Sequence, residues 1–311
     1  MEDEKLIGLE VLDDPLYKGQ EKRVELARQK NLSPELIEAL SRDEDWEVRT
    51  TLGIYQDLTP ELIEALSRDE DWGVRYAIAG REDLTPAQID ILSRDADSFV
   101  RKEIAKRSDL TAEQIKRLVS DSDTSVRAVI AGHPDLTAEQ IETLSRDEDW
   151  EVRLAIAERD DLTEEQRDRL SQDKEESVRE ALARKALLRA EQVERLLQDK
   201  SALVRFVVAM VYLLTPSGIN KLINDPDAKV REALTSQPLL SPAQIETLSK
   251  DESKEVRKGI ASRQDLPPSV IRRLSEDSDL EVRETLLRNN VYKKVIEKEQ
   301  KLSRKKRNLK V

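Results

Sequence analysis

Two charged residues recur along the chain at a fixed spacing, and they are the first candidates for chemistry. An aspartate stands five residues before a Val-Arg dipeptide, as at Asp69 and Arg75 or at Asp147 and Arg153. Aspartate can serve as a general base or a metal ligand, and arginine can hold a carboxylate or phosphate through two parallel hydrogen bonds. The pair occurs ten times in register, however, whereas a catalytic site is needed once. We therefore predict a structural ladder in which arginine donates to aspartate and to turn carbonyls.

Other catalytic and metal-binding chemistry has little support in the sequence. The chain has no cysteine, which removes disulfides, thiolate ligands and cysteine nucleophiles. The single histidine, His133, has no second histidine with which to build a metal site. Asp-x-Asp turns such as Asp43 and Asp45 lack the other ligands and the glycine of a calcium loop, and helix capping explains them. We predict no enzyme activity, no catalytic residue, no cofactor and no metal.

The interval between successive charged pairs is always 26 residues, which identifies an internal repeat. Val-Arg recurs from Val48-Arg49 to Val282-Arg283, and a leucine stands sixteen residues before each valine. Ten repeats without an insertion cover residues 32–291. Each repeat can bury its apolar face only on its neighbours. The sequence therefore predicts an all-α fold, a right-handed α/α solenoid of ten 26-residue two-helix repeats with N- and C-terminal caps.

One repeat, residues 58–83, shows how two short helices are encoded and how they would position the charged columns. Thr59 and Pro60 suit the N-cap and the first position of a helix, and Asp71 can cap a second helix. Helices this short are unstable alone, so stacking must hold them. We place an N-terminal cap in residues 1–31, one solenoid domain in residues 32–291, and a basic, partly disordered extension in residues 292–311.

Charge is distributed unevenly along the chain. The formal net charge is −12, yet the segment from Lys293 to Val311 has nine basic residues against two acidic ones, so the body is strongly acidic. The basic tail could contact nucleic acid or an anionic membrane, act as a targeting address, or only increase solubility. No run of apolar residues reaches the roughly 18 that a membrane span needs, so no span is predicted.

A column of basic residues lies seven positions after the repeated valine. Cations at this position could simply favour the negative end of the second helix. They could also form a stripe spaced to bind a phosphate backbone or an acidic peptide. The candidate binding stripe consists of Arg81, Arg107, Arg159, Lys185 and Arg263.

The seventh repeat carries apolar residues where other repeats alternate with charge. If they are exposed, they form a site for a partner or for self-association. The alternative is a locally thicker core or a contact with the C-terminal segment. The candidate patch consists of Leu203, Phe206, Val207, Met210 and Tyr212. Trp46, Trp72 and Trp150, which share another column, could likewise be a recognition stripe or cover the joints between repeats.

The repeat Leu-Thr-Pro-x-x-Ile-x-x-Leu-Ser-Arg-Asp-x-Asp-x-x-Val-Arg-x-x-Ile-Ala resembles the leucine-rich repeat variant and, more broadly, short HEAT-type repeats. The resemblance rests on the Asp-x4-Val-Arg core of every repeat. It implies an α/α solenoid in which one helix of each pair can be of 3₁₀ type, with an Asp–Arg ladder within and between repeats. An iron–sulfur centre held by cysteines, known in this family, is not implied because this chain has no cysteine.

These observations favour a non-catalytic binding scaffold that presents an extended repeat surface for protein–protein interaction. The alternative is nucleic-acid binding through the basic stripe and the basic tail. The acidic body counts against this alternative because nucleic-acid affinity depends on neutralising phosphates. The sequence does not encode the partner's identity, and self-association stays open. The lack of cysteine and of an apolar N-terminal segment fits a cytoplasmic protein.

Overall fold

The computed structural model describes residues 7–185, 187–289 and 292. In this part of the chain there are 21 α-helices, two short 3₁₀ helices at Leu9–Asp13 and Pro15–Tyr17, and no strand beyond a single bridge between Ile7 and Leu32. The predicted all-α solenoid fold is confirmed. The basic tail from Lys293 onward lies outside the described residues.

The first helix of most repeats begins where the sequence supplies a cap. Thr85, for example, accepts a hydrogen bond from the backbone N–H of Gln88, and the Gln88 side chain accepts one from the N–H of Thr85. Proline at the first position, as at Pro86, costs nothing because the N–H there has no helical partner. The ten first helices are α2 (Pro34–Leu40), α4 (Pro60–Leu66), α6 (Pro86–Leu92), α8 (Ala112–Val119), α10 (Ala138–Leu144), α12 (Glu164–Leu170), α14 (Ala190–Leu196), α16 (Pro216–Leu222), α18 (Pro242–Leu248) and α20 (Pro268–Ser275).

The second helix of most repeats begins at an aspartate. Asp71 accepts a hydrogen bond from the backbone N–H of Gly73, and Asp149 does the same for Glu151. The Asp-x-Asp turns are thus helix caps. The ten second helices are α3 (Trp46–Tyr55), α5 (Trp72–Ala79), α7 (Ser98–Ala105), α9 (Thr124–Ile130), α11 (Trp150–Ala157), α13 (Glu176–Arg184), α15 (Ala202–Val211), α17 (Ala228–Leu234), α19 (Lys254–Ala261) and α21 (Leu280–Arg288).

The core lies between the two helices of each repeat and between neighbouring repeats. The repeated valine is fully buried, as at Val74, and so is the large aliphatic residue four positions later, as at Ile78. Before the first repeat, α1 (Gln20–Ala27) buries Leu26 and Ala27 and packs on α3. The chain then turns at Asn31, which adopts a positive φ of 64°. Short helices that cannot persist alone are thereby stabilised by their neighbours.

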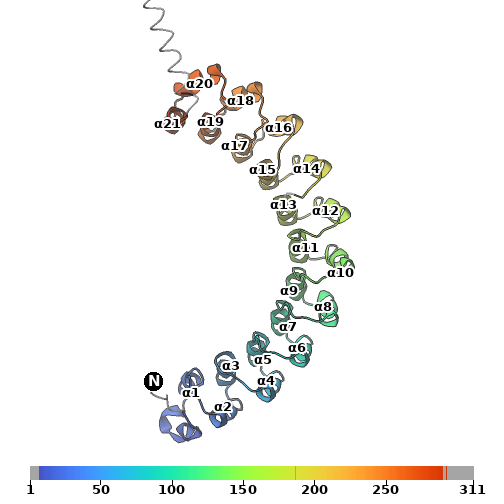
Figure 1. Ribbon diagram of the computed structural model, residues 1–311, viewed down its shortest axis with the longest axis vertical. Coiled ribbons are helices and arrows are strands. Elements are labelled where there is room, and N and C mark those ends of the chain that lie inside the picture. Colours follow the sequence, from blue (N-terminus) through green and yellow to red (C-terminus); the bar gives the residue numbers. More distant parts are fainter. Residues whose placement is uncertain (1–6, 186, 290–291, 293–311) are drawn as a thin grey trace, which may run out of the picture. The chain divides into compact units, whose positions relative to one another are not determined.

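Contacts divide the chain into two units, Met1–Arg159 and Asp160–Val311, which we call the N-terminal and C-terminal units. Within each unit, the second helices of successive repeats pack on one another, as α3 on α5 and α15 on α17. Figure 1 shows that the odd-numbered helices of a unit form one layer and the even-numbered helices the other. We call the exposed side of the odd-numbered layer the second-helix face. The domain limits proposed from the sequence stay a prediction.

No helix in the described part of the chain combines the length and the apolar character that crossing a bilayer requires.

Candidate functional site

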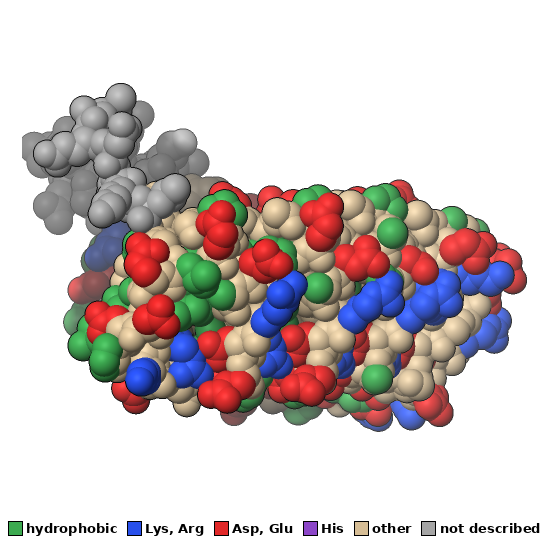
Figure 2. All heavy atoms as spheres, turned by 90° about the horizontal axis from the view of Figure 1, so that it is seen from below, with side chains coloured by type: hydrophobic (Ala, Val, Ile, Leu, Met, Phe, Trp, Pro, Cys, Tyr) green, Lys and Arg blue, Asp and Glu red, His purple; other side chains and the backbone are tan. Residues whose placement is uncertain are grey.

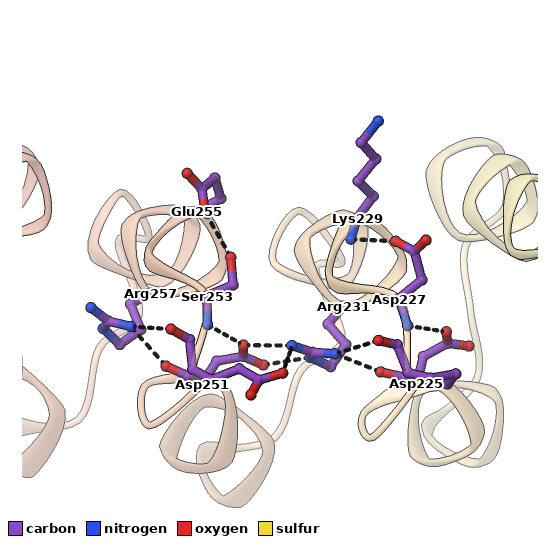
Figure 3. A network of polar contacts seen from close by, with 10 residues as sticks. Asp225, Asp227, Lys229, Arg231, Asp251, Ser253, Glu255 and Arg257 are labelled. Atoms are coloured by element: carbon purple, nitrogen blue, oxygen red, sulfur yellow. Dashed lines mark hydrogen bonds and ion pairs between the residues drawn. The ribbon is translucent and has the colours of Figure 1, made fainter.

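Within each unit, the Asp and Arg columns form a ladder that joins one repeat to the next. Arg231 donates from Nε and Nη2 to the two carboxylate oxygens of Asp251, at 2.7 and 2.9 Å, and from Nη1 to the carbonyl of Asp225 at 2.6 Å. Asp251 in turn accepts from the backbone N–H of Ser253, which closes its own turn (Figure 3). One guanidinium thus ties its own turn to the aspartate of the following repeat.

The same arrangement recurs through both units. Ion pairs join Arg49 to Asp69, Arg75 to Asp95 and Arg127 to Asp147. Arg153 is buried and donates to the carbonyls of Asp147 and Glu148. The charged groups of these rungs therefore bind one another and the protein's own backbone. Further rungs pair Arg23 with Asp43, Arg101 with Asp121, Arg179 with Asp199, Arg205 with Asp225 and Arg257 with Asp277.

The ladder alters the acid–base behaviour of its carboxylates. Burial disfavours the charged form of Asp199, but the hydrogen bonds from Arg179 and from the backbone N–H of Ser201 outweigh it and hold the pKa of Asp199 below its ordinary value. The pKa values of Asp147, Asp251 and Asp277 are lowered for the same reasons.

We expect the ladder to make the protein sensitive to acid. A carboxylate whose pKa is lower in the folded state stabilises that state above its unfolded pKa, about 3.9 for aspartate, and this contribution is lost as the pH falls through the folded pKa. The melting temperature should therefore fall steeply below about pH 4. Differential scanning calorimetry between neutral pH and acid checks this. Arg179→Ala, which lacks one guanidinium, should lose less on acidification, and an unchanged melting temperature at pH well below 4 would contradict the prediction.

The basic column forms a second ladder, directed at backbone carbonyls. Arg81 donates from Nη1 to the carbonyls of Gly53 and Gln56 at 2.7 and 3.0 Å, and its other nitrogens bind Asp83. Arg263 binds Thr235 and Gln237 in the same way. These carbonyls lie in the last turn of the second helix of the preceding repeat or just after it, where carbonyls have no helical partner.

The other members of the candidate stripe are engaged similarly. Arg107 donates to the carbonyl of Arg81, and Arg159 to those of Ala131 and His133. Lys185 instead pairs with Asp160 at 2.6 Å. Neutral residues of the column also bind backbone carbonyls. His133 contacts the carbonyl of Arg107, Gln237 those of Ala209 and Tyr212, and Asn289 those of Ala261 and Arg263. This geometry favours the interpretation that the column stabilises the negative end of a helix, although that helix belongs to the preceding repeat. The binding role of the column stays a prediction.

The structure separates the apolar residues of the seventh repeat into two groups. Val207 is 3% exposed and belongs to the core, so it is no part of a surface patch. Phe206 and Tyr212 are half-buried against the same core. Leu203 and Met210 are 42% and 53% exposed on the second-helix face. With Phe206 they line a groove of about 640 Å³ between α15 and α17, which is completed by Asp227, Lys229, Glu232, Ala233, Thr235 and Ser236.

A second groove, which the sequence reasoning missed, lies on the second-helix face of the N-terminal unit. It measures about 810 Å³ and extends over α3, α5 and α7. Its apolar lining includes Trp72, whose ring centroid lies 5.6 Å from that of Phe99 and 6.5 Å from that of Tyr76. Trp72 contacts Phe99 of the next repeat, which fits the prediction that it covers the joint between two repeats. Its side chain is nevertheless half-exposed.

The two grooves occupy equivalent places in the repeat. Ile54 stands six residues after the repeated valine of the first repeat, as Met210 does in the seventh, and α3 and α15 each have ten residues where most second helices have seven or eight. The residue that follows Ile54, Tyr55, cannot donate as arginine does, and Gln56 instead binds the carbonyls of Ala27 and Gln29. The signal for the first groove was present in the sequence as Ile54, Tyr76 and Phe99, at positions that are polar in most of the other repeats.

Within the described ranges, no group of three or more His, Asp or Glu side chains is arranged to hold a metal ion. The histidine at position 133 is buried and bonded to the backbone.

No model of a known protein family matches this sequence, and no curated protein matches it. Among solved structures, a leucine-rich repeat variant described as having a novel repetitive structural motif is 27% identical, with a TM-score of 0.58 over 71% of this chain and 87% of that chain. An engineered protein is 16% identical with a TM-score of 0.30, covering 88% of this chain and 96% of its own. A designed armadillo repeat protein for modular peptide recognition is 13% identical with a TM-score of 0.17, covering 82% and 96%.

Only the first of these is similar enough in structure to support the fold. Its identity and TM-score show a likeness of fold over 71% of this chain. The chain is therefore a helical repeat protein whose α/α solenoid fold is similar to that of the leucine-rich repeat variant.

Proposed function

We propose that the protein is a non-catalytic scaffold that binds a protein partner on its second-helix face. The observation that carries the proposal is the exposure of Leu203 and Met210 beside the groove between α15 and α17. Large apolar side chains that are exposed together, with polar residues around them, are typical of interaction sites. The charged columns are occupied by the protein's own ladders, whereas Leu203 and Met210 present exposed apolar surface.

The double variant Leu203→Asp with Met210→Asp tests this proposal. Both side chains are exposed, so the variant should melt within a few degrees of the parent while losing a partner that co-purifies with the parent chain. We expect binding to weaken by about 2 kcal/mol or more if these residues are central to the interface. Pull-down with quantitative mass spectrometry, followed by calorimetry with the identified partner, gives the measurement.

Leu287→Asp is the matched control, because Leu287 is equally exposed on a second helix, α21, but lies away from the groove. It should retain the partner. A partner held equally by the parent, the control and the double variant would contradict the proposal. Light scattering of the same proteins tells whether the partner is a second copy of this chain.

The nucleic-acid alternative stays a prediction, and the contacts described above do not favour it. Arg81, Arg107 and Arg263 direct their guanidinium groups to carbonyls and aspartates of the protein. On the face drawn in Figure 2, acidic side chains lie among the basic ones, without a continuous basic stripe. Nucleic-acid binding depends on unopposed positive charge.

A further inference from the structure

The groove of the N-terminal unit combines an aromatic floor with an acidic rim. Trp72 lies beside both Tyr76 and Phe99, and Ile54 and Tyr55 extend the apolar lining from α3. All five side chains are exposed. Aromatic rings of this kind offer a large apolar surface and a face that attracts cations.

The charged residues of this groove are mostly acidic. Its lining has four carboxylates and one guanidinium, that of Arg81, which is committed to backbone carbonyls and to Asp83. Glu103 accepts from Lys106. Asp57 and Glu82 are exposed and, among the described residues, form no ion pair with the protein's own cations. The groove therefore offers two carboxylates to a ligand beside its aromatic residues.

A glycine keeps the acidic end of the groove open. Gly80 stands six residues after the repeated valine, where the third and sixth repeats carry Lys106 and Arg184. A Cβ atom at Gly80 would meet only the carbonyl oxygens of Ala77 and Tyr76, at 3.6 and 3.9 Å. The backbone there is right-handed helical, with φ −76° and ψ −4°, so a larger residue fits the fold and would project into the groove.

We propose that this groove binds a segment of a partner protein in which a lysine or arginine stands next to a large apolar residue. The apolar side chain would cover the Trp72–Phe99 pair, and the cation would lie between an aromatic face and the carboxylates of Asp57 and Glu82. The inference rests on the proposed scaffold function and adds the chemistry of the ligand. A phosphate backbone or an acidic peptide would be repelled by the same carboxylates.

A display library of random peptides, selected on the immobilised full-length chain, provides the test. Peptides that pair a basic with an aromatic or large aliphatic residue should be enriched, and Gly80→Lys should weaken their binding about tenfold or more in fluorescence anisotropy. Gly132→Lys is the matched control, because Gly132 occupies the same column, is exposed, and has only the carbonyl of Val129 near its Cβ position, outside the groove. It should bind as the parent does, and both variants should melt no lower than the parent.

A second variant separates the charge from the shape of the site. Asp57→Asn with Glu82→Gln leaves the aromatic floor intact and should weaken the basic peptides about tenfold while removing their preference over uncharged analogues. The inference would be overturned if acidic peptides were recovered, if the two glycine variants bound equally well, or if no peptide were enriched. The proposed function would still stand in those cases if the Leu203 and Met210 variant loses its partner, because that groove lies between other helices.

Discussion

Replacing Arg231 with alanine is expected to destabilise the C-terminal unit by about 3–5 kcal/mol, because one partner of a buried ion pair is removed while the other stays. The side chains of Arg231 and Asp251 are each 7% exposed. Without the guanidinium, Asp251 keeps the N–H of Ser253 but loses two charge-assisted bonds, and the carbonyl of Asp225 loses its donor. Urea unfolding followed by circular dichroism gives the change in free energy.

Arg283→Ala is the control for this prediction. Arg283 is the last arginine of the column, and position 303, where the next aspartate would stand, is a serine. Its guanidinium donates to the carbonyl of Asp277. Its removal should therefore cost about 1.5–3 kcal/mol, the value of a hydrogen bond made by a charged group, which is less than the cost of breaking a buried ion pair. If Arg231→Ala were no more destabilising than Arg283→Ala, the ladder would not be a source of stability, and the arginine column would need another explanation.

The fold was predictable from the sequence because the chain aligns to itself. A strict 26-residue interval fixes which residues are equivalent, so caps such as Thr59 and Asp71 and the buried Val74 could be assigned together. Short helices stabilised by their neighbours leave little freedom once those residues are placed. The ladder followed from the same columns, although the spacing alone did not show that an arginine binds the aspartate of the following repeat, as Arg49 binds Asp69.

The candidate site was less predictable, because a column shows what repeats share and a site depends on how one repeat differs. Arg81 was equally compatible with a binding stripe, and only the positions of the carbonyls of Gly53 and Gln56 distinguish the two interpretations. Val207 could not be assigned to core or surface within an apolar run. The aromatic groove depends on side chains from three second helices, so no single repeat reveals it.

Gly259→Ala is expected to destabilise the protein by about 1–3 kcal/mol, although the same change in an unhindered helix usually stabilises it. A Cβ atom at Gly259 in α19 would lie 2.3 Å from Oγ1 of Thr235 and 2.9 Å from its Cβ. Rotating the threonine side chain moves Oγ1 but leaves its Cβ in place, so the two helices must separate slightly. Thermal unfolding of the variant beside the parent measures the effect, and Gly132→Ala, which meets no side chain, should be neutral or stabilising.

The sequence itself supplies the compensating change. Thr235 stands five residues after the repeated valine, where seven of the repeats have alanine, and Gly259 stands three residues after the valine of the next repeat, where Ala77 and Ala155 are found. Ala209 and Ala233 occupy the same two positions in the preceding pair of repeats. Thr235 and Gly259 thus share a space that two alanines fill there. Thr235→Ala should therefore rescue Gly259→Ala, with a coupling energy of about 1–3 kcal/mol in the double-mutant cycle. Additive effects of the two changes would show that the helices accommodate both side chains independently, and that the contact between α17 and α19 is looser than the structure places it.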